Sequence, residues 1–216
     1  MQVDGSGPPW QALAMARIDF WYDFASTYSY LAAMRAEKLA QAAGVSLRWR
    51  PFLLGPIFKS HGMEASPFNL YPVKGRYSWR DLERLVERQG LPKFTPPVPF
   101  PANSILAART ALALSDAARP DFSRAVFHAE FADGRDISDR ALIGELLTKL
   151  SEDAESVLAR TGEVEMKDKL RSETDEAARQ GIFGAPNFVT EDGELFWGND
   201  RFEQALDWAR TSARKA

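Results

Sequence analysis

The chain has 216 residues, of which 45% are hydrophobic, and its formal net charge is −3 with acidic and basic residues interspersed. That length can bury a full core as one compact unit, and the near-balanced charge favours neither nucleic acid nor an anionic membrane as a partner. Because the sequence contains no cysteine and only two histidines, it excludes disulfides, thiolate zinc sites, dithiol redox centres and histidine-rich metal sites.

Residues 1–16 lack the basic start and the apolar stretch of a secretory signal, and we expect them to form a disordered leader. No apolar run in the sequence approaches the roughly 20 residues that a helix needs to cross a bilayer. The sequence therefore predicts a cytoplasmic protein with no membrane segment.

The first structured elements form a β-α-β unit. Residues 18–24 are typical of a buried strand, residues 28–43 predict a helix that stops at Gly44, and residues 45–52 alternate between apolar and polar as a second strand does. A strand that follows another through one helix is expected to run parallel to it, by a right-handed crossover.

Ser26 falls where the first strand ends and the helix begins. A hydroxyl at this point lies beside the first free N–H groups of the helix, at the positive end of its dipole, where an anion such as a thiolate is stabilised. Because the chain has no cysteine, such a thiolate must arrive with a ligand. The alternative is that Ser26 serves only as a helix N-cap, a role worth about 1 kcal/mol.

The middle of the chain predicts helices. Residues 53–77 lose periodicity and collect prolines and glycines, so we expect an ordered loop there, and the proline-rich residues 91–101 suit neither a helix nor a central strand. Helical patterns cover residues 78–89, 104–118, 120–132, 139–150, 154–160 and 164–180.

The chain ends in a hairpin and a helix. Strand patterns at residues 187–190 and 194–197 flank an Asp-Gly turn, and residues 201–213 form an amphipathic helix. With the block of middle helices removed, the order is β-α-β-α-β-β-α, which predicts a four-stranded mixed sheet flanked by helices.

The sequence also contains a set of short motifs: DFASTYSYL at 23–31, RPFLLG at 50–55, PVKGRY at 72–77, GIFGAP at 181–186 and FWGNDR at 196–201. Together with the order of the elements, these motifs resemble the thioredoxin superfamily, and more specifically the DsbA-like branch with the kappa-class glutathione transferases and the 2-hydroxychromene-2-carboxylate isomerases. The resemblance implies an α/β, thioredoxin-like domain in two pieces, residues 17–77 and 180–216, around a large all-helical insertion at 78–179.

By this resemblance, Ser26 is the catalytic residue and its hydroxyl donates to the sulfur of bound glutathione. A donor to the charged form lowers the pKa of a thiol and raises its thiolate fraction. The family's next residue is usually proline, whereas here it is Thr27, so a second hydroxyl stands nearby and which of the two serves the sulfur stays open.

The resemblance also implies the rest of the glutathione site. Ala185 would pair with the cysteinyl backbone, with Pro186 in the cis form, and Asn199 and Asp200 would receive the γ-glutamyl end unless they only cap the last helix. Lys74 would reach the glycyl carboxylate, or it is a solvated surface lysine.

Other residues have weaker claims. Arg50 and Arg76, with Lys74, are candidates to bind a substrate carboxylate, because cationic side chains suit carboxylates. His61 is a candidate proton shuttle or a surface residue, His128 is expected to be structural, and whether Asn69 replaces the family asparagine absent after Gly62 is open. Eight aromatic residues could wall an apolar pocket or belong to the core: Phe52, Phe58, Phe68, Tyr71, Tyr77, Trp79, Phe94 and Phe100.

The function that the resemblance implies is isomerisation of 2-hydroxychromene-2-carboxylate to trans-o-hydroxybenzylidenepyruvate in aromatic-hydrocarbon breakdown. A glutathione thiolate held by Ser26 would add to the ring-opened substrate and leave after bond rotation. Glutathione is thus the expected cofactor, a small aromatic carboxylate the substrate and a homodimer the assembly. The alternatives are a kappa-type transferase or peroxidase and a non-catalytic thioredoxin-like binding module.

Overall fold

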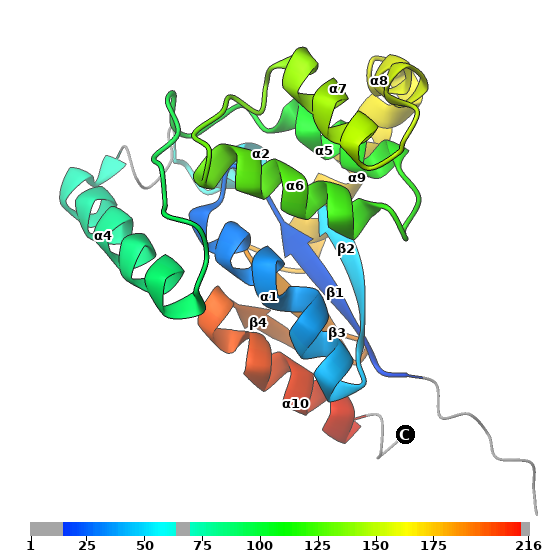
Figure 1. Ribbon diagram of the computed structural model, residues 1–216. Helices are drawn as coiled ribbons and strands as arrows, with labels where there is room; N and C mark the ends of the chain where they lie inside the picture. Colours follow the sequence, from blue (N-terminus) through cyan, green and yellow to red (C-terminus); the bar gives the residue numbers. More distant parts are fainter. Residues whose placement is uncertain (1–14, 64–69, 213–216) are drawn as a thin grey trace, which may run out of the picture.

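A computed structural model describes residues 15–63 and 70–212, and its centre is a four-stranded sheet in the order β2-β1-β3-β4 (Figure 1). β1 runs parallel to β2 and antiparallel to β3, and β3 runs antiparallel to β4. The predicted mixed sheet is thereby confirmed, with strand ends that differ by one or two residues. The strands are β1 (Arg17–Tyr22), β2 (Ser46–Pro51), β3 (Asn187–Thr190) and β4 (Leu195–Trp197).

Helices cover both faces of the sheet. α1 and α10 lie on one face and α9 lies on the other, while α5 to α8 form a separate layer at the end where β1 leads into α1 (Figure 1). The helices are α1 (Thr27–Ala43), α2 (Leu54–Ser60), α4 (Pro72–Gln89), α5 (Ile105–Ala113), α6 (Arg119–Phe131), α7 (Arg140–Lys149), α8 (Ala154–Thr161), α9 (Val164–Arg179) and α10 (Phe202–Ser212).

The side chains of β1 alternate between the two faces, as a central strand requires. Ile18, Phe20 and Tyr22 are fully buried in the larger core, on the side of α1 and α10. Trp21 points the other way, into a smaller cluster that includes Ala177 of α9. This double burial explains why β1 reads as a nearly continuous apolar run.

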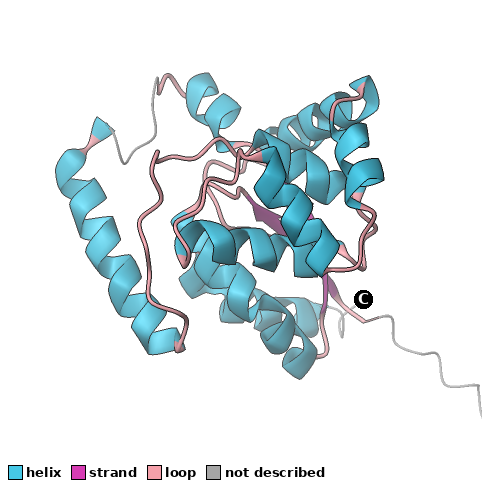
Figure 2. Cartoon of the chain, turned by 45° about the horizontal axis from the view of Figure 1, so that its top comes forward, coloured by secondary structure: helices cyan, strands magenta, loops and turns pink. Residues whose placement is uncertain are grey.

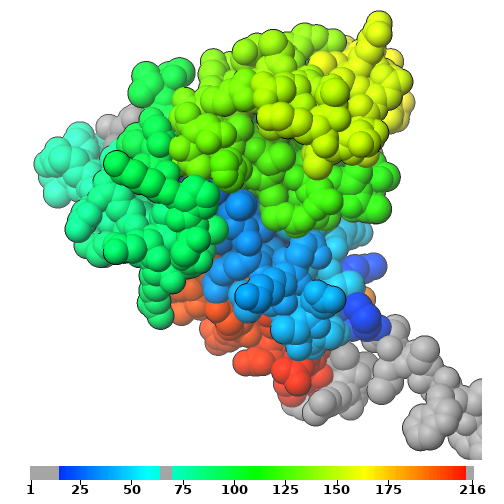
Figure 3. Space-filling view, viewed as in Figure 1, coloured from blue at the N-terminus to red at the C-terminus, as the bar shows by residue number. Residues whose placement is uncertain are grey.

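Aromatic packing joins the helical layer to the sheet. Phe127 of α6 lies 5.0 Å from Phe24 and 5.8 Å from Tyr22, ring centre to ring centre, and Phe131 stacks on Tyr30 of α1 at 5.3 Å. One continuous core therefore runs from the sheet into the insertion, and Figure 3 shows the green and yellow helical layer seated directly on the blue elements.

The predicted loop at 53–77 is wrong in its secondary structure. It contains α2, whose Ile57 is buried, and the first turns of α4, which begins at Pro72 rather than at residue 78. Proline is well suited to the first position of a helix, and a glycine inside a helix hides its pattern, here at Gly75. Residues 64–69 lie outside the described residues, and with them the question about Asn69.

The proline-rich segment after α4 is neither helix nor strand, as predicted. It runs back along α4 (Figure 2) and is held there by aromatic contacts, because Phe94 stacks on Trp79 at 5.4 Å and Phe100 meets the same ring at 4.7 Å. The contact places Phe100 between α4 and the start of α5.

The other predicted helices are present with shifted ends. The largest shift concerns the helix predicted for 104–118, which ends at Ala113 because Leu114 has an extended backbone. The last helix is preceded by a 3-10 turn, Asn199–Arg201. Of the predicted leader, residues 1–14 lie outside the description, whereas the Ala16 carbonyl already accepts a hydrogen bond from Ser46 N–H at 2.9 Å.

None of the described helices is long and apolar enough to cross a membrane.

Candidate active site

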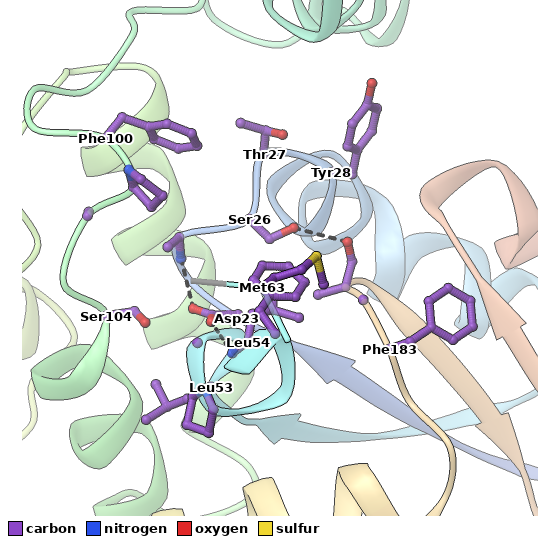
Figure 4. A pocket seen from close by; sticks show the side chains of 18 of the residues that line it. Asp23, Ser26, Thr27, Tyr28, Leu53, Leu54, Met63, Phe100, Ser104 and Phe183 are labelled. Carbon is purple, nitrogen blue, oxygen red and sulfur yellow. Dashed lines mark hydrogen bonds between the residues drawn. The ribbon is translucent and has the colours of Figure 1, made fainter. Parts of the chain in front are cut away.

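Ser26 lies at the junction of β1 and α1 and is the N-cap of the helix. Its backbone is extended, with φ −97° and ψ 115°, and its hydroxyl oxygen accepts a hydrogen bond from Ser29 N–H at 3.2 Å. The same hydroxyl donates to the carbonyl oxygen of Ala185 at 3.1 Å (Figure 4). The capping role and the contact with Ala185 therefore coexist in one side chain.

These two hydrogen bonds limit how the Ser26 hydroxyl can bind a ligand. A hydroxyl carries one proton, so Ser26 can donate to an anion only by giving up its bond to Ala185. The exchange exposes two groups together, the Ser26 donor and the Ala185 carbonyl acceptor. A ligand that offers both an anion and a backbone-like N–H would satisfy both of them.

The Ala185–Pro186 peptide bond is cis, as the resemblance implies. Its segment, between α9 and β3, is fixed by two further contacts. The Asn187 side-chain amide donates to the Gly184 carbonyl at 2.6 Å, and Gly198 N–H donates to the Pro186 carbonyl at 3.0 Å. These bonds hold Ala185 over the start of α1.

A cavity of about 530 Å³ opens over Ser26, and its walls are mostly apolar. Asp23 and Lys74 are the two charged side chains that line it, as far as residues 15–63 and 70–212 are concerned. Walls from α2, the proline-rich segment, α5 and the loop before β3 enclose it (Figure 4). Its larger apolar side chains are Leu53, Leu54, Phe58, Met63, Phe100, Ile105, Phe183 and Trp197.

Lys74 lies in the first turn of α4, not in the loop that the sequence predicts, and it lines the cavity. Arg76, two residues further along the same helix, is exposed and is not among the lining residues. The structure thus brings one of these two cations to the candidate site.

Arg50 is held on the far side of the sheet. Its guanidinium bonds to Glu173 of α9 at 2.8 and 3.1 Å and to Asp19 at 3.1 Å, and it lies 3.8 Å above the Trp21 ring. With its donors engaged there, Arg50 does not line the cavity, and its predicted role in binding a carboxylate loses its geometric basis.

Asn199 and Asp200 stand at the start of the last helical segment. The Asn199 side-chain oxygen accepts a hydrogen bond from Arg35 at 3.0 Å, and Arg35 also bonds to Glu203 of α10. Asp200 has a largely exposed carboxylate, 3.2 Å from Arg201. Neither lines the cavity itself, so a ligand would meet them only by extending past Trp197.

The histidines and Thr27 are placed as follows. His61 is exposed, with its Nδ1 2.8 Å from the Ile57 carbonyl, and His128 lies 3.4 Å from Asp133 on the surface of α6. Neither histidine lines the cavity. Thr27 does line it, although only 2% of the residue is exposed, so the choice between the hydroxyls of Ser26 and Thr27 is a question for experiment.

Of the eight aromatic residues proposed as pocket walls, Phe58 and Phe100 line the cavity. Phe52 belongs to the core beneath Trp21, and Tyr71 and Tyr77 are exposed. Phe68 lies outside the described residues, and Trp79 and Phe94 support Phe100 from behind.

Three aromatic cavity residues were missed by the sequence reasoning: Tyr28, Phe183 and Trp197. Phe183 and Trp197 form an edge-to-face pair at 4.8 Å, and each is about half exposed, at 46% and 52%. Gly184 makes this possible, because a Cβ there would lie 2.6 Å from Nε1 of Trp197. The signal was present, since all three residues fall inside the motifs named above, but they were interpreted as parts of a helix, a loop and a strand.

No group of histidine and carboxylate side chains among the described residues could hold a metal ion.

The family follows from a direct comparison of the sequence. Residues 17–208 match the DsbA-like thioredoxin domain. The chain belongs to this family. This match and the four-stranded mixed sheet confirm the predicted thioredoxin-like fold.

Within the DsbA-like family, relatives with two activities are similar over most of the chain. A 2-hydroxychromene-2-carboxylate isomerase of Pseudomonas sp. (strain C18) is 32% identical over 187 residues, covering 85% of this chain and 85% of that protein. Glutathione S-transferase kappa 1 of Homo sapiens is 28% identical over 204 residues, covering 86% and 87%. A solved structure of 2-hydroxychromene-2-carboxylate isomerase, 26% identical, matches with a TM-score of 0.82 over 93% of this chain and 99% of that one.

Proposed function

We propose that the protein is a glutathione-dependent isomerase of the 2-hydroxychromene-2-carboxylate type, with Ser26 as the residue that holds the glutathione sulfur as thiolate. The observation that carries the proposal is the Ser26 hydroxyl, placed at the first turn of α1, in contact with Ala185 and at the wall of an apolar cavity. The relatives support the reaction class, since they are named as such isomerases and as kappa-class glutathione transferases.

The residues present fit glutathione. The cavity volume lies in the range of about 300–1,000 Å³ that is common for small-molecule sites. Ser26 would donate to the sulfur, the backbone of Ala185 would pair with the cysteinyl backbone, and Lys74 would attract the glycyl carboxylate. The γ-glutamyl end would pass Trp197 toward Asn199 and Asp200, at the positive end of α10.

The chemistry that bound glutathione supplies is a nucleophilic sulfur, which adds reversibly to a conjugated carbon of the substrate. The protein's part is to keep this sulfur ionised and to hold the substrate. The hydroxyl of Ser26 and the helix dipole both favour the charged form of the thiol. The apolar walls exclude water and orient a ring-shaped substrate, which strengthens these interactions.

A kappa-type transferase is the second candidate, and one observation favours it. Lys74 is the single cationic side chain found on the cavity lining of the described chain, and glutathione already requires it. A substrate carboxylate would then lack a cation of its own, whereas an uncharged electrophile would not need one. The transferase uses the same thiolate but keeps the sulfur in the product.

Product analysis separates these functions. Incubation with glutathione and 2-hydroxychromene-2-carboxylate is expected to give trans-o-hydroxybenzylidenepyruvate, whose formation is monitored by its absorbance. The total concentration of free thiol should stay constant during the reaction. A transferase would consume one thiol for each product molecule when given an electrophile such as a chloronitrobenzene. If the protein gives neither product and glutathione accelerates nothing, it is a binding module and the proposal is wrong.

Lys74 and Arg76 provide a matched pair of variants on one helix. We expect Lys74→Ala to raise the dissociation constant of glutathione by about tenfold, because a charge-assisted bond to a carboxylate is worth about 1.5–3 kcal/mol. Arg76→Ala removes a cation two residues away that does not line the cavity, and it should leave the constant within about twofold, as a surface change does. Calorimetric titration measures both, and equal effects would show that Lys74 acts only through general charge.

A further inference from the structure

Asp23 is a buried carboxylate at the cavity, and the proposed chemistry gives it no role. The residue is 4% exposed and follows β1 directly. Its carboxylate accepts hydrogen bonds from Ala25 N–H at 3.0 Å and from Leu54 N–H at 2.7 Å (Figure 4). The Ser104 side chain, which also lines the cavity, lowers the pKa of this carboxyl.

These three groups belong to three separate walls of the cavity. Ala25 is in the turn that carries Ser26, Leu54 is the first residue of α2, and Ser104 precedes the first residue of α5. Neither α2 nor α5 has a side-chain cap from its own N-cap residue, and Asp23 accepts the first free N–H of α2, that of Leu54. One carboxylate thus serves chain segments about 30 and 80 residues away.

The chemistry of this cluster requires a carboxylate. Each of the two oxygens accepts from a backbone N–H, which can only donate, so the central group must accept at both positions; an ionised aspartate does this and an asparagine amide does not. Burial raises the pKa of Asp23, and the bonds from Leu54, Ser104 and Ala25 counteract that rise. Among the described residues no cation pairs with this carboxylate, so neutral donors alone hold it beside the ligand cavity.

We propose that Asp23 is a positioning residue for the thiolate site, which fixes the turn of Ser26 relative to the substrate walls formed by α2 and α5. The inference rests on the proposed function. Asp23 acts through the Ala25 amide. The hydrogen bond to this amide fixes the backbone next to Ser26, so that the Ser26 hydroxyl points toward the sulfur at the N-terminus of α1. The same carboxylate holds Leu54 and Ser104 at a constant distance from that hydroxyl. The apolar walls therefore keep a fixed position relative to the bound sulfur.

The test is a double-mutant cycle that combines Asp23→Asn with Ser26→Ala. Bound glutathione is titrated by thiolate ultraviolet absorbance, and its dissociation constant is measured by calorimetry at a fixed pH. In the presence of Ser26, Asp23→Asn is expected to lower kcat by about tenfold and to raise the pKa of the bound thiol, with less than about threefold change in KM for glutathione. In the Ser26→Ala background, Asp23→Asn should not raise the pKa of the bound thiol further, because the effects of substituting two coupled residues are not additive.

Two further variants test whether the effect is specific to the interactions of Asp23. Asp153→Asn makes the same chemical change at the N-cap of α8, where the carboxylate accepts from Ser156 N–H at 3.1 Å, and it should leave the bound thiol and kcat unchanged. Ser104→Ala removes one donor and keeps the carboxylate. It should shift kcat in the same direction as Asp23→Asn but by less, and it keeps the test valid if Asp23→Asn does not fold.

The outcomes are distinct. If wild-type protein binds glutathione as thiolate and the thiol of Asp23→Asn or Ser104→Ala titrates as in wild type, the inference is overturned while the proposed function stands. Equal effects of Asp23→Asn with and without Ser26 would also overturn it, because the residue would then act on stability alone. If wild-type protein does not bind glutathione, the proposed function fails and this inference fails with it.

Discussion

Ser26→Ala is expected to lower kcat/KM of the glutathione-dependent reaction by about 100-fold, the lower end of what the loss of one donor to a catalytic anion costs. The physical reason is that the hydroxyl stabilises only the charged form of the sulfur, so its removal raises the pKa of the bound thiol. The thiolate absorbance of bound glutathione should fall in parallel at neutral pH. Steady-state kinetics and difference absorbance measure the two effects on the same sample.

Two controls separate chemistry from stability in this variant. Ser26 also caps α1, so its loss should cost about 1 kcal/mol of folding stability. Asp153→Ala removes a comparable cap from α8, away from the cavity, and should lower stability similarly without changing kcat/KM. Thr27→Val tests the neighbouring hydroxyl: if it abolishes the thiolate absorbance while Ser26→Ala retains it, Thr27 serves the sulfur.

Glu130→Gln is expected to stabilise the protein at neutral pH. Glu130 is fully buried in α6, and neither of its carboxyl oxygens has a hydrogen-bond partner among the described residues. Burial, with smaller contributions from the negative charges of Asp23 and Asp136, raises its pKa well above the ordinary range. The folded protein therefore keeps a proton there that the unfolded chain loses.

This difference in bound protons makes the free energy of unfolding depend on pH. An unfolded glutamate ionises near pH 4.3, so above that pH the unfolded state gains stability relative to the folded one, until the folded carboxyl ionises too. Stability of the wild type should fall as the pH rises through this window. A glutamine side chain cannot ionise, so Glu130→Gln should unfold at a higher urea concentration than wild type at pH 7, and at the same concentration below about pH 4.

Urea unfolding at pH 4 and pH 7 measures this change. Glu87→Gln makes the same substitution at an exposed position of α4 and should shift stability by less than about 0.5 kcal/mol at either pH. A gain in Glu130→Gln that is equal at both pH values would show that packing, not protonation, causes it.

The errors of the sequence analysis have a common physical origin. Residues 53–77 were predicted as a loop because proline and glycine usually interrupt a helical pattern. In the structure, Pro72 instead starts α4, and Gly75 is a buried residue of that helix at the cavity. Arg50 and Lys74 looked alike as cations in motifs. Their difference arises from the pleat of β2, which turns Arg50 toward α9, and from the start of α4, which turns Lys74 toward the cavity.

The amino-acid sequence was sufficient for the local facts: the strand-to-helix junction at Ser26, the absence of any cysteine, and the four strands in their order along the chain. These depend on periodicity, on turn residues and on composition, all of which act over a few neighbouring positions. The cavity became visible only in the folded chain, because its walls come from segments far apart in the sequence. The convergence of Ala25, Leu54 and Ser104 on Asp23, and the pairing of Phe183 with Trp197, exist only once packing has brought those segments together.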